Sequence, residues 1–127
     1  MTRFLLVCLG GGLGSGARYL VATWVARLAP GAFPFGTLAV NAAGSFLLSL
    51  VMHVGLTTEM IPPHVRLMLT TGVMGGFTTY STFNYETSGY LREGAWAAGV
   101  LNITATVAGC LVAGFAGLAL ARALFGR

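Results

Sequence analysis

The sequence predicts an all-α membrane protein with four transmembrane helices in a single domain, residues 1–127. Apolar residues make up 56% of the 127 residues, only 8% are charged, and the mean hydropathy is +0.82. Soluble domains carry about 25% charged residues to keep their surfaces hydrated. Stretches with little charge recur at about the 20 residues that a helix needs to cross a bilayer. The four spans are expected at about residues 4–28, 35–57, 64–91 and 95–121.

The first span runs from Phe4 to Leu28 and is interrupted by Arg18. Its beginning imitates a secretory signal peptide, because Arg3 precedes a short apolar run and then small residues. Sequence compatible with a helix nevertheless continues through Trp24 to a second polar border. We therefore expect a retained transmembrane helix rather than a cleaved signal.

The other spans are separated by residues that favour turns. Pro34 precedes the second span, Pro62 and Pro63 separate it from the third, and Gly94 precedes the fourth, which is rich in Ala, Val, Leu and Gly.

Orientation in the membrane follows the arginines in the connections. With four spans, Arg27 and Arg92 lie on one side of the membrane. Four other arginines lie on the opposite side: Arg3, Arg66, Arg122 and Arg127. So weak a bias permits insertion in both orientations, and an antiparallel pair would have a two-fold axis in the membrane plane.

The charge pattern argues against nucleic acid and nucleotide ligands. The net charge of +4 comes from seven dispersed arginines with no lysine, whereas nucleic-acid binding needs clustered cations. The stretch from Gly12 to Ala17 fits a loose dinucleotide pattern, but it lacks a preceding strand and an acidic residue about 20 positions later. We expect helix packing there.

Cysteines and histidines give no clear metal or redox motif. Cys8 and Cys110 lie in apolar surroundings near opposite ends of the chain and are expected to be packing residues. His53 and His64 have no ligand spacing to a cysteine or carboxylate, and we expect them at the membrane interface.

Nineteen glycines indicate close approach of helix backbones in lipid. Three pairs have the GxxxG spacing: Gly10/Gly14, Gly12/Gly16 and Gly72/Gly76. Four packed helices of one chain are too few to enclose an ion path and still seal against lipid. The small-residue faces therefore favour a homo-oligomer.

Polar groups at membrane depth are costly, so each is a candidate for function. Arg18 either reaches the lipid headgroups, pairs with a helix end, or attracts anions. The amide of Asn41 either joins two helices or donates to a ligand. Gly75 and Gly76 lie just before two threonines, and this segment of the third span is poor material for a continuous helix. We therefore predict a break, whose free backbone groups must be buried or line a cavity.

If the helix resumes near Thr79, Tyr80 and Phe83 share one face, and Thr79, Thr82 and Glu86 lie on another. Aromatic rings have positive edges, so this wall favours a small anion without a fixed cation that would trap it. The alternative is ordinary aromatic packing, with the threonines bonded back to their own helix.

These residues resemble the Fluc (CrcB-type) fluoride channels over nearly the whole chain. The resemblance rests on the order and spacing of three motifs: Gly11–Gly14 with Arg18-Tyr19, Gly36–Leu38 with Val40-Asn41, and Thr71-Gly72 with Gly75–Phe83. It implies an antiparallel, dual-topology homodimer in the lipid bilayer, with two pores and a multi-pass location in the cell (inner) membrane. It also implies passive export of fluoride by a channel and not by an enzyme.

The resemblance further implies a role for individual residues. A central sodium ion would be held by the backbone carbonyls of Gly75 and Thr78. The fluoride path would use Asn41, Tyr80 and Phe83 and then the hydroxyls of Ser81 and Thr82, with Arg18 and Glu86 at the vestibules. Tyr80 departs from the usual phenylalanine, and Cys110 stands where a serine is expected.

Two alternatives remain open at the level of sequence. A small dual-topology, proton-coupled multidrug exporter needs a carboxylate within the membrane, and Glu86, toward a helix end, is the one candidate. A non-conducting assembly subunit of a larger membrane complex would explain the glycines, but not Asn41 together with the segment from Thr78 to Phe83. We also find no nucleophile with a base and an orienting group, and no paired-carboxylate site.

Overall fold

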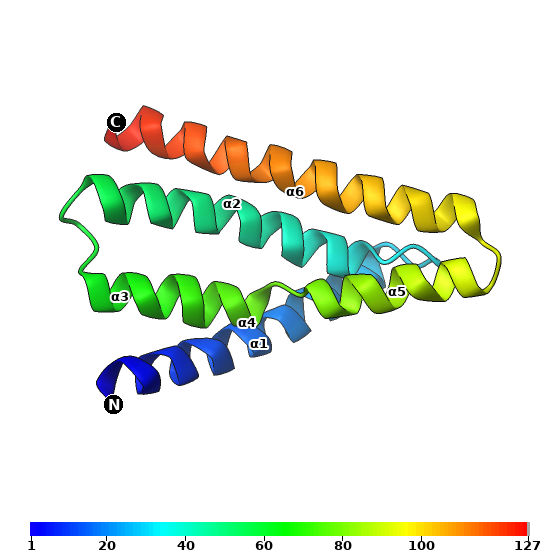
Figure 1. Cartoon of the computed structure of the whole chain (residues 1–127), viewed down its shortest axis with the longest axis horizontal. Helices are drawn as coiled ribbons and strands as arrows, with labels where there is room; N and C mark the ends of the chain where they lie inside the picture. The colour runs from blue at the N-terminus through cyan, green and yellow to red at the C-terminus, as the bar shows by residue number, and fades with distance from the viewer. Residues whose placement is uncertain (127) are drawn as a thin grey trace.

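The computed structural model describes residues 1–126 as an all-helical bundle (Figure 1). The elements in order are α1 (Thr2–Leu28), α2 (Phe35–Thr57), α3 (Pro63–Leu67), the π-helical segment η1 (Met68–Met74), α4 (Gly75–Phe77), α5 (Tyr80–Arg92) and α6 (Trp96–Phe125). Arg127, which contributes to the expected arginine bias, lies outside the described residues. The all-α prediction is confirmed over residues 1–126.

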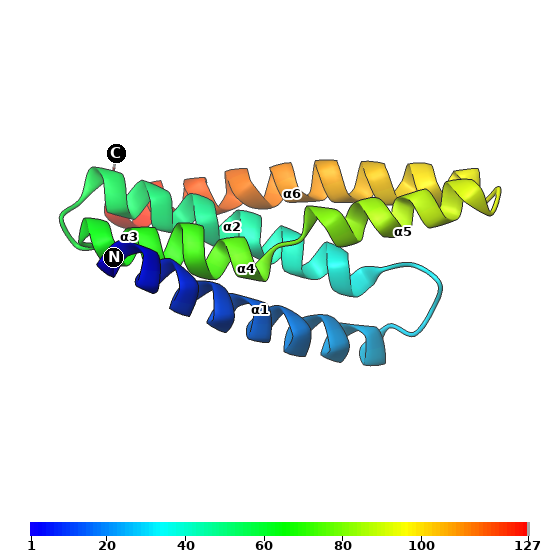
Figure 2. The ribbon, with the colours of Figure 1, turned by 60° about the horizontal axis from the view of Figure 1, so that its bottom comes forward.

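Three helices, α1, α2 and α6, are long and apolar enough to cross a membrane. The segments α3, η1, α4 and α5 follow one another along an interrupted rod between α2 and α6 in chain order, which we call the third rod (Figures 1 and 2). The start of α1, the connection from α2 to α3 and the end of α6 lie at one end of the bundle (Figure 1). This is the arrangement of ends that four successive crossings require.

The third rod is interrupted at Thr78 and Thr79, as the glycines and threonines predict. Both residues have extended backbones, with φ/ψ of −85°/158° at Thr78 and −151°/104° at Thr79. The helix resumes at Tyr80, where the Thr79 hydroxyl accepts a hydrogen bond from the Thr82 backbone N–H at 3.3 Å. Thr79 is therefore the N-cap residue of α5.

The interruption changes the neighbours of the third rod. Before it, α3, η1 and α4 pack against α1; after it, α5 packs against α2 and α6 (Figure 2). The partner thus changes from α1 to α6 along the rod, and the break lies where this change occurs. The break also lies beside α2, which contacts both halves.

Glycines make the close packing of α1 against the first half possible. A Cβ at Gly10 would lie 2.6 Å from the Met68 carbonyl oxygen, and one at Gly72 would lie 3.0 Å from the Gly10 Cα. Gly14 and Gly76 also face backbone across this contact. The expected packing role is therefore confirmed for Gly10/Gly14 and Gly72/Gly76. Among residues 1–126, no neighbouring atom lies within 4 Å of such a Cβ at Gly12 or Gly16, so the structure shows no close packing at this pair.

The outer surface is largely apolar, and much of the small buried core is polar. Leu13 on α1 and Phe115 on α6 are exposed, while the buried polar residues include Asn41, Thr87 and Asn102. A soluble domain reverses this distribution. The pattern suits a surface in contact with lipid or another helix and a core that carries the polar chemistry.

Candidate functional site

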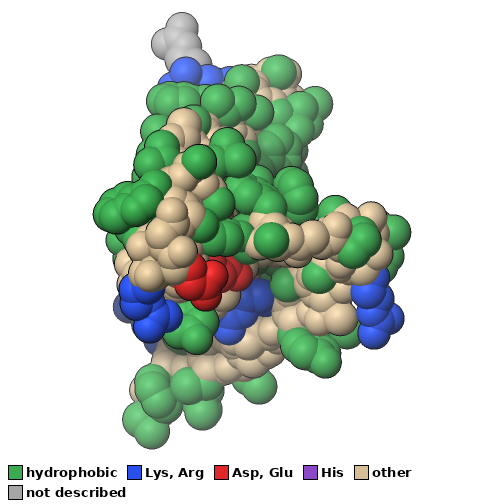
Figure 3. All heavy atoms as spheres, turned by 90° about the vertical axis from the view of Figure 1, so that its right-hand side faces the viewer, with side chains coloured by type: hydrophobic (Ala, Val, Ile, Leu, Met, Phe, Trp, Pro, Cys, Tyr) green, Lys and Arg blue, Asp and Glu red, His purple; other side chains and the backbone are tan. Residues whose placement is uncertain are grey.

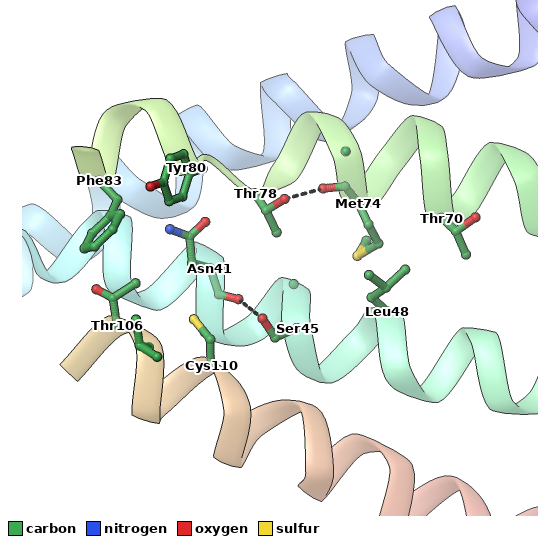
Figure 4. Close-up of a pocket in the computed structure, with 13 residues that line it drawn as sticks. Asn41, Ser45, Leu48, Thr70, Met74, Thr78, Tyr80, Phe83, Thr106 and Cys110 are labelled. Carbon is green, nitrogen blue, oxygen red and sulfur yellow. Dashed lines mark hydrogen bonds between the residues drawn. The ribbon is translucent and has the colours of Figure 1, made fainter. Parts of the chain in front are cut away.

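A cavity of about 410 Å³ lies beside the break in the third rod (Figure 4). Its wall combines residues of α2, the third rod and α6: Asn41, Gly44, Ser45, Leu48, Thr70, Met74, Gly75, Thr78, Tyr80, Phe83, Thr106, Val107 and Cys110. Five of the residues predicted for the site are among them, namely Asn41, Gly75, Thr78, Tyr80 and Phe83. Every residue in this wall is uncharged.

The Asn41 side chain joins α2 to the break. Its Oδ1 accepts a hydrogen bond from the Thr79 backbone N–H at 2.7 Å, and its Nδ2 donates to the Thr79 carbonyl at 3.1 Å. Both residues are buried, with 8% of Asn41 and 7% of Thr79 exposed. We call this two-bond contact the Asn41–Thr79 clasp. The inter-helix bond considered for Asn41 is present, and the amide retains a second N–H.

The aromatic pair lies on the α5 wall of the cavity. The Tyr80 and Phe83 ring centroids are 5.7 Å apart, and the ring planes are inclined at 56°. Phe83 is buried, whereas the Tyr80 side chain is 77% exposed. The predicted common face of the two residues is confirmed by this contact. An inclined pair of rings can present edge hydrogens to a small anion.

Thr106 on α6 is a wall residue that the sequence analysis missed. The residue is buried, and its Oγ1 has no hydrogen-bond partner among the described residues. A buried hydroxyl without a partner costs free energy, so its presence calls for an explanation. The signal available in the sequence was a polar residue near the middle of an apolar span. Cys110, one turn further on α6, lines the same cavity, and both cysteines are free thiols.

A second cavity of about 610 Å³ lies between the α1–α2 connection and α5. Thr37, Thr82, Glu86 and Glu93 are among its lining residues, and the Thr37 hydroxyl donates to Glu86 Oε1 at 2.7 Å. Figure 3 shows this end of the bundle, where acidic side chains gather at a hollow with basic side chains around it. Thr82 and Glu86 line this second cavity, whereas the Tyr80 and Phe83 rings line the first. The expected separation of Thr82 and Glu86 from the aromatic face is therefore confirmed.

The two predicted hydroxyls of α5 surround the Thr79 side chain. The Thr79 Oγ1 lies 2.9 Å from Thr82 Oγ1 and 3.3 Å from Ser81 Oγ. Ser81 is exposed and is not part of either cavity wall. The structure therefore places the Ser81 and Thr82 hydroxyls next to the clasp and not in the first cavity.

The backbone at the break offers carbonyl oxygens. In a continuous helix the Thr79 N–H would bond the Gly75 carbonyl, but here that N–H is donated to Asn41. The Arg18 Nη1 donates to the Thr78 carbonyl at 3.4 Å, which is long for a hydrogen bond. Arg18 thus lies beside the break, and Gly75 and Thr78 present oxygens there that are free or only weakly bonded.

The site can hold a small anion without a fixed positive charge. The spare N–H of Asn41, the Thr106 hydroxyl and the ring edges are all neutral donors. In such a wall, several weak contacts together replace hydration, and none of them alone traps the ion.

A sequence profile of the CrcB-like proteins, described as Camphor Resistance (CrcB), matches residues 5–118. The chain belongs to the CrcB family. A relative in Anaeromyxobacter sp. (strain K), named fluoride-specific ion channel FluC, is 56% identical over 126 residues, covering 99% of this chain and 100% of the relative. FluC proteins of Sorangium cellulosum (strain So ce56) and Geobacter sulfurreducens are 49% and 48% identical, each over 98% of this chain and covering 98% and 100% of those relatives. Together with three helices of membrane-spanning length, the family indicates a membrane protein.

Proposed function

We propose that this CrcB-family chain forms a fluoride-selective ion channel that lets fluoride leave the cell passively. The observation that carries the proposal is the first cavity, whose uncharged wall brings Asn41, Tyr80, Phe83 and Thr106 together at the break. The names of its FluC relatives, which match it over their whole length, support the same function.

Fluoride is small and strongly hydrated, so a channel must offer replacement donors and still let the ion leave. The amide of Asn41 has one N–H that the clasp does not use, and Thr106 has a hydroxyl without a partner. The edges of the two rings complete the set. Larger anions such as chloride are less hydrated and gain less from closely placed donors, which favours fluoride.

The working unit of the proposal is an antiparallel homodimer of dual topology, with two pores. Tyr80 lines the cavity with a ring that is 77% exposed in the single chain, and the Gly12/Gly16 face lacks a partner within the chain. A second copy would cover such surfaces. The weak arginine bias allows the two copies opposite orientations, and we propose the inner membrane as their location.

A sodium ion at the dimer centre is part of the proposal. Backbone carbonyls are suitable ligands for a hard cation, and the Gly75 carbonyl lacks its helical donor while that of Thr78 has only the long contact to Arg18. The two oxygens of one chain are too few to enclose a cation, so the second copy would supply the others. The ion would bind the two breaks together and supply no chemistry beyond this.

Purified protein in liposomes tests the function directly. With potassium fluoride inside and valinomycin added, we expect rapid fluoride efflux at a fluoride electrode. With potassium chloride inside instead, we expect far slower chloride efflux at a chloride electrode. An efflux trace no faster than that of protein-free vesicles, with the dimer shown to be intact, would refute the channel. The same vesicles distinguish the alternatives, because a proton-coupled exporter would move a cationic dye with a pH gradient and an assembly subunit would move neither.

A further inference from the structure

We propose that Asn102 and Thr87 are positioning residues that fix the Phe83 ring in the wall of the fluoride path. The inference rests on the proposed function, since it concerns the same cavity. Neither residue was singled out from the sequence, and neither is part of the cavity wall. They act through the helix that carries Phe83.

The contact is a short chain of hydrogen bonds between α6 and α5. Asn102 Nδ2 donates to Thr87 Oγ1 at 2.9 Å, and the Thr87 hydroxyl donates to the Phe83 carbonyl at 2.8 Å. Only 1% of Asn102 is exposed, and Thr87 and Phe83 are buried as well. Buried polar groups bonded in this way lose much if one partner is removed.

The position of this contact relates it to the cavity. Thr87 lies one turn after Phe83 on α5, and Asn102 lies one turn before Thr106 on α6. Because α5 and α6 run antiparallel (Figure 1), the Asn102–Thr87 bond joins the two helices one turn away from Phe83 and Thr106. The Asn102–Thr87 bond therefore sets the register between Phe83 on α5 and Thr106 on α6, which face the same cavity.

The α5 helix needs such a contact because the break separates it from α4. The helical backbone bonds end with the one from the Thr78 N–H to the Met74 carbonyl, and the Thr79 N–H bonds Asn41 instead. The 13 residues of α5 are therefore held by their packing and side-chain bonds. Apolar packing alone tolerates small rotations and shifts. A directional bond between two buried polar side chains specifies one register.

The test uses two nearly isosteric variants and two controls. Thr87→Val and Asn102→Leu remove the bond, Thr87→Ser keeps the hydroxyl, and Thr104→Val makes the same Thr-to-Val change at an exposed site of α6. For NMR alone, each protein is also prepared with 4-fluorophenylalanine at position 83, whereas efflux is measured on the unlabelled proteins, because the label replaces an edge hydrogen of the ring. The ¹⁹F resonance of that ring, the fluoride efflux, the fluoride-to-chloride ratio and the dimer fraction are then measured.

We expect Thr87→Val and Asn102→Leu to shift or broaden the ¹⁹F resonance and to lower the efflux or the fluoride-to-chloride ratio by about 2- to 10-fold, the range that one lost hydrogen bond allows. The dimer fraction should not change, and both controls should match the parent protein. If Asn102→Leu does not fold, Thr87→Val decides, because it removes only one hydroxyl.

An unchanged ¹⁹F resonance in Thr87→Val would overturn the positioning role. Suppose that the parent protein conducts fluoride. A variant with a changed ¹⁹F resonance but unchanged efflux and selectivity would then overturn the role of the Asn102–Thr87 contact in the fluoride path. If the parent protein passes no fluoride, it is the proposed function that fails. The ¹⁹F resonance then still shows whether Asn102 and Thr87 position Phe83.

Discussion

Replacing Asn41 with leucine tests the Asn41–Thr79 clasp. The variant has a similar volume but can neither accept from the Thr79 N–H nor donate to the Thr79 carbonyl. Thr79 is only 7% exposed, so water does not readily replace these bonds. Each buried group left without a partner costs about 1–3 kcal/mol. For two such groups, we expect the free energy of unfolding to fall by about 2–6 kcal/mol.

Thermal unfolding of the detergent-solubilised protein, followed by tryptophan fluorescence, measures this loss. A decrease of 2 kcal/mol or more corresponds to a melting temperature lower by at least about 8 °C in a domain of this size. Asn84→Leu is the matched control, since Asn84 is exposed on α5, and a surface change of this kind stays within about 0.5 kcal/mol. If Asn41→Leu melts at the parent temperature, the clasp does not hold the break together.

Asn41→Asp separates the role of the clasp from the role of the amide toward an anion. The carboxylate can still accept from the Thr79 N–H, but it cannot donate to the Thr79 carbonyl. It also brings a negative charge into a wall that has none. We expect fluoride efflux to be abolished while the dimer still forms. Efflux at the parent rate would show that the fluoride path does not pass Asn41.

Three further predictions concern other parts of the site and the bundle. Phe83→Ile should suppress fluoride efflux by at least about 10-fold without dissociating the dimer, because a ring edge cannot be replaced by an aliphatic group; unchanged efflux would contradict the aromatic wall. Thr106→Val should slow efflux yet leave the melting temperature equal or higher, because it removes a buried hydroxyl that has no partner; a clear loss of stability would reveal a hidden partner. Gly14→Ala should destabilise the protein by about 1–3 kcal/mol, since its Cβ would meet the backbone of the third rod; Gly89→Ala, where nothing lies within 4 Å inside α5, should be neutral or stabilising in the same melting assay.

The helices and the break could be predicted because their causes are local. The length of an apolar run sets whether a helix can cross a bilayer, and glycines followed by β-branched threonines weaken a helix wherever they occur. The structure accordingly interrupts the third rod at Thr78 and Thr79 and resumes at Tyr80. Helical periodicity then places the rings on one face and Glu86 on another.

The partners of the freed backbone groups could not be predicted, because they come from distant parts of the chain. The sequence left Asn41 with two roles, as an inter-helix bond or as a donor to a ligand. The contact with Thr79, 38 residues away, uses one N–H and leaves one free, so the two roles are compatible. Likewise, three GxxxG pairs look alike in sequence, yet only two of them find a partner within the chain.

Thr106 and Asn102 were missed for a related reason. They and Thr104 are the few polar residues of the apolar fourth span, and no recognisable motif surrounds them. Their difference lies in their neighbours: Asn102 has a partner in Thr87, whereas Thr106 faces the cavity without one. The local sequence marks both residues as costly in the membrane. Only the packing of α5 against α6 shows that Asn102 supports the cavity wall and that Thr106 is part of it.

The placement of charge around the two cavities also favours a channel. The first cavity has an uncharged wall, with Arg18 outside it against the Thr78 carbonyl, while the second contains Glu86 and Glu93. A carboxylate near an anion path lowers the affinity for the anion, and an arginine in the wall would raise it. Conduction needs binding that is favourable enough for entry and weak enough for release. Neutral donors at the break with carboxylates in the neighbouring cavity meet both needs, whereas a site built to retain an anion would place its cations in the wall.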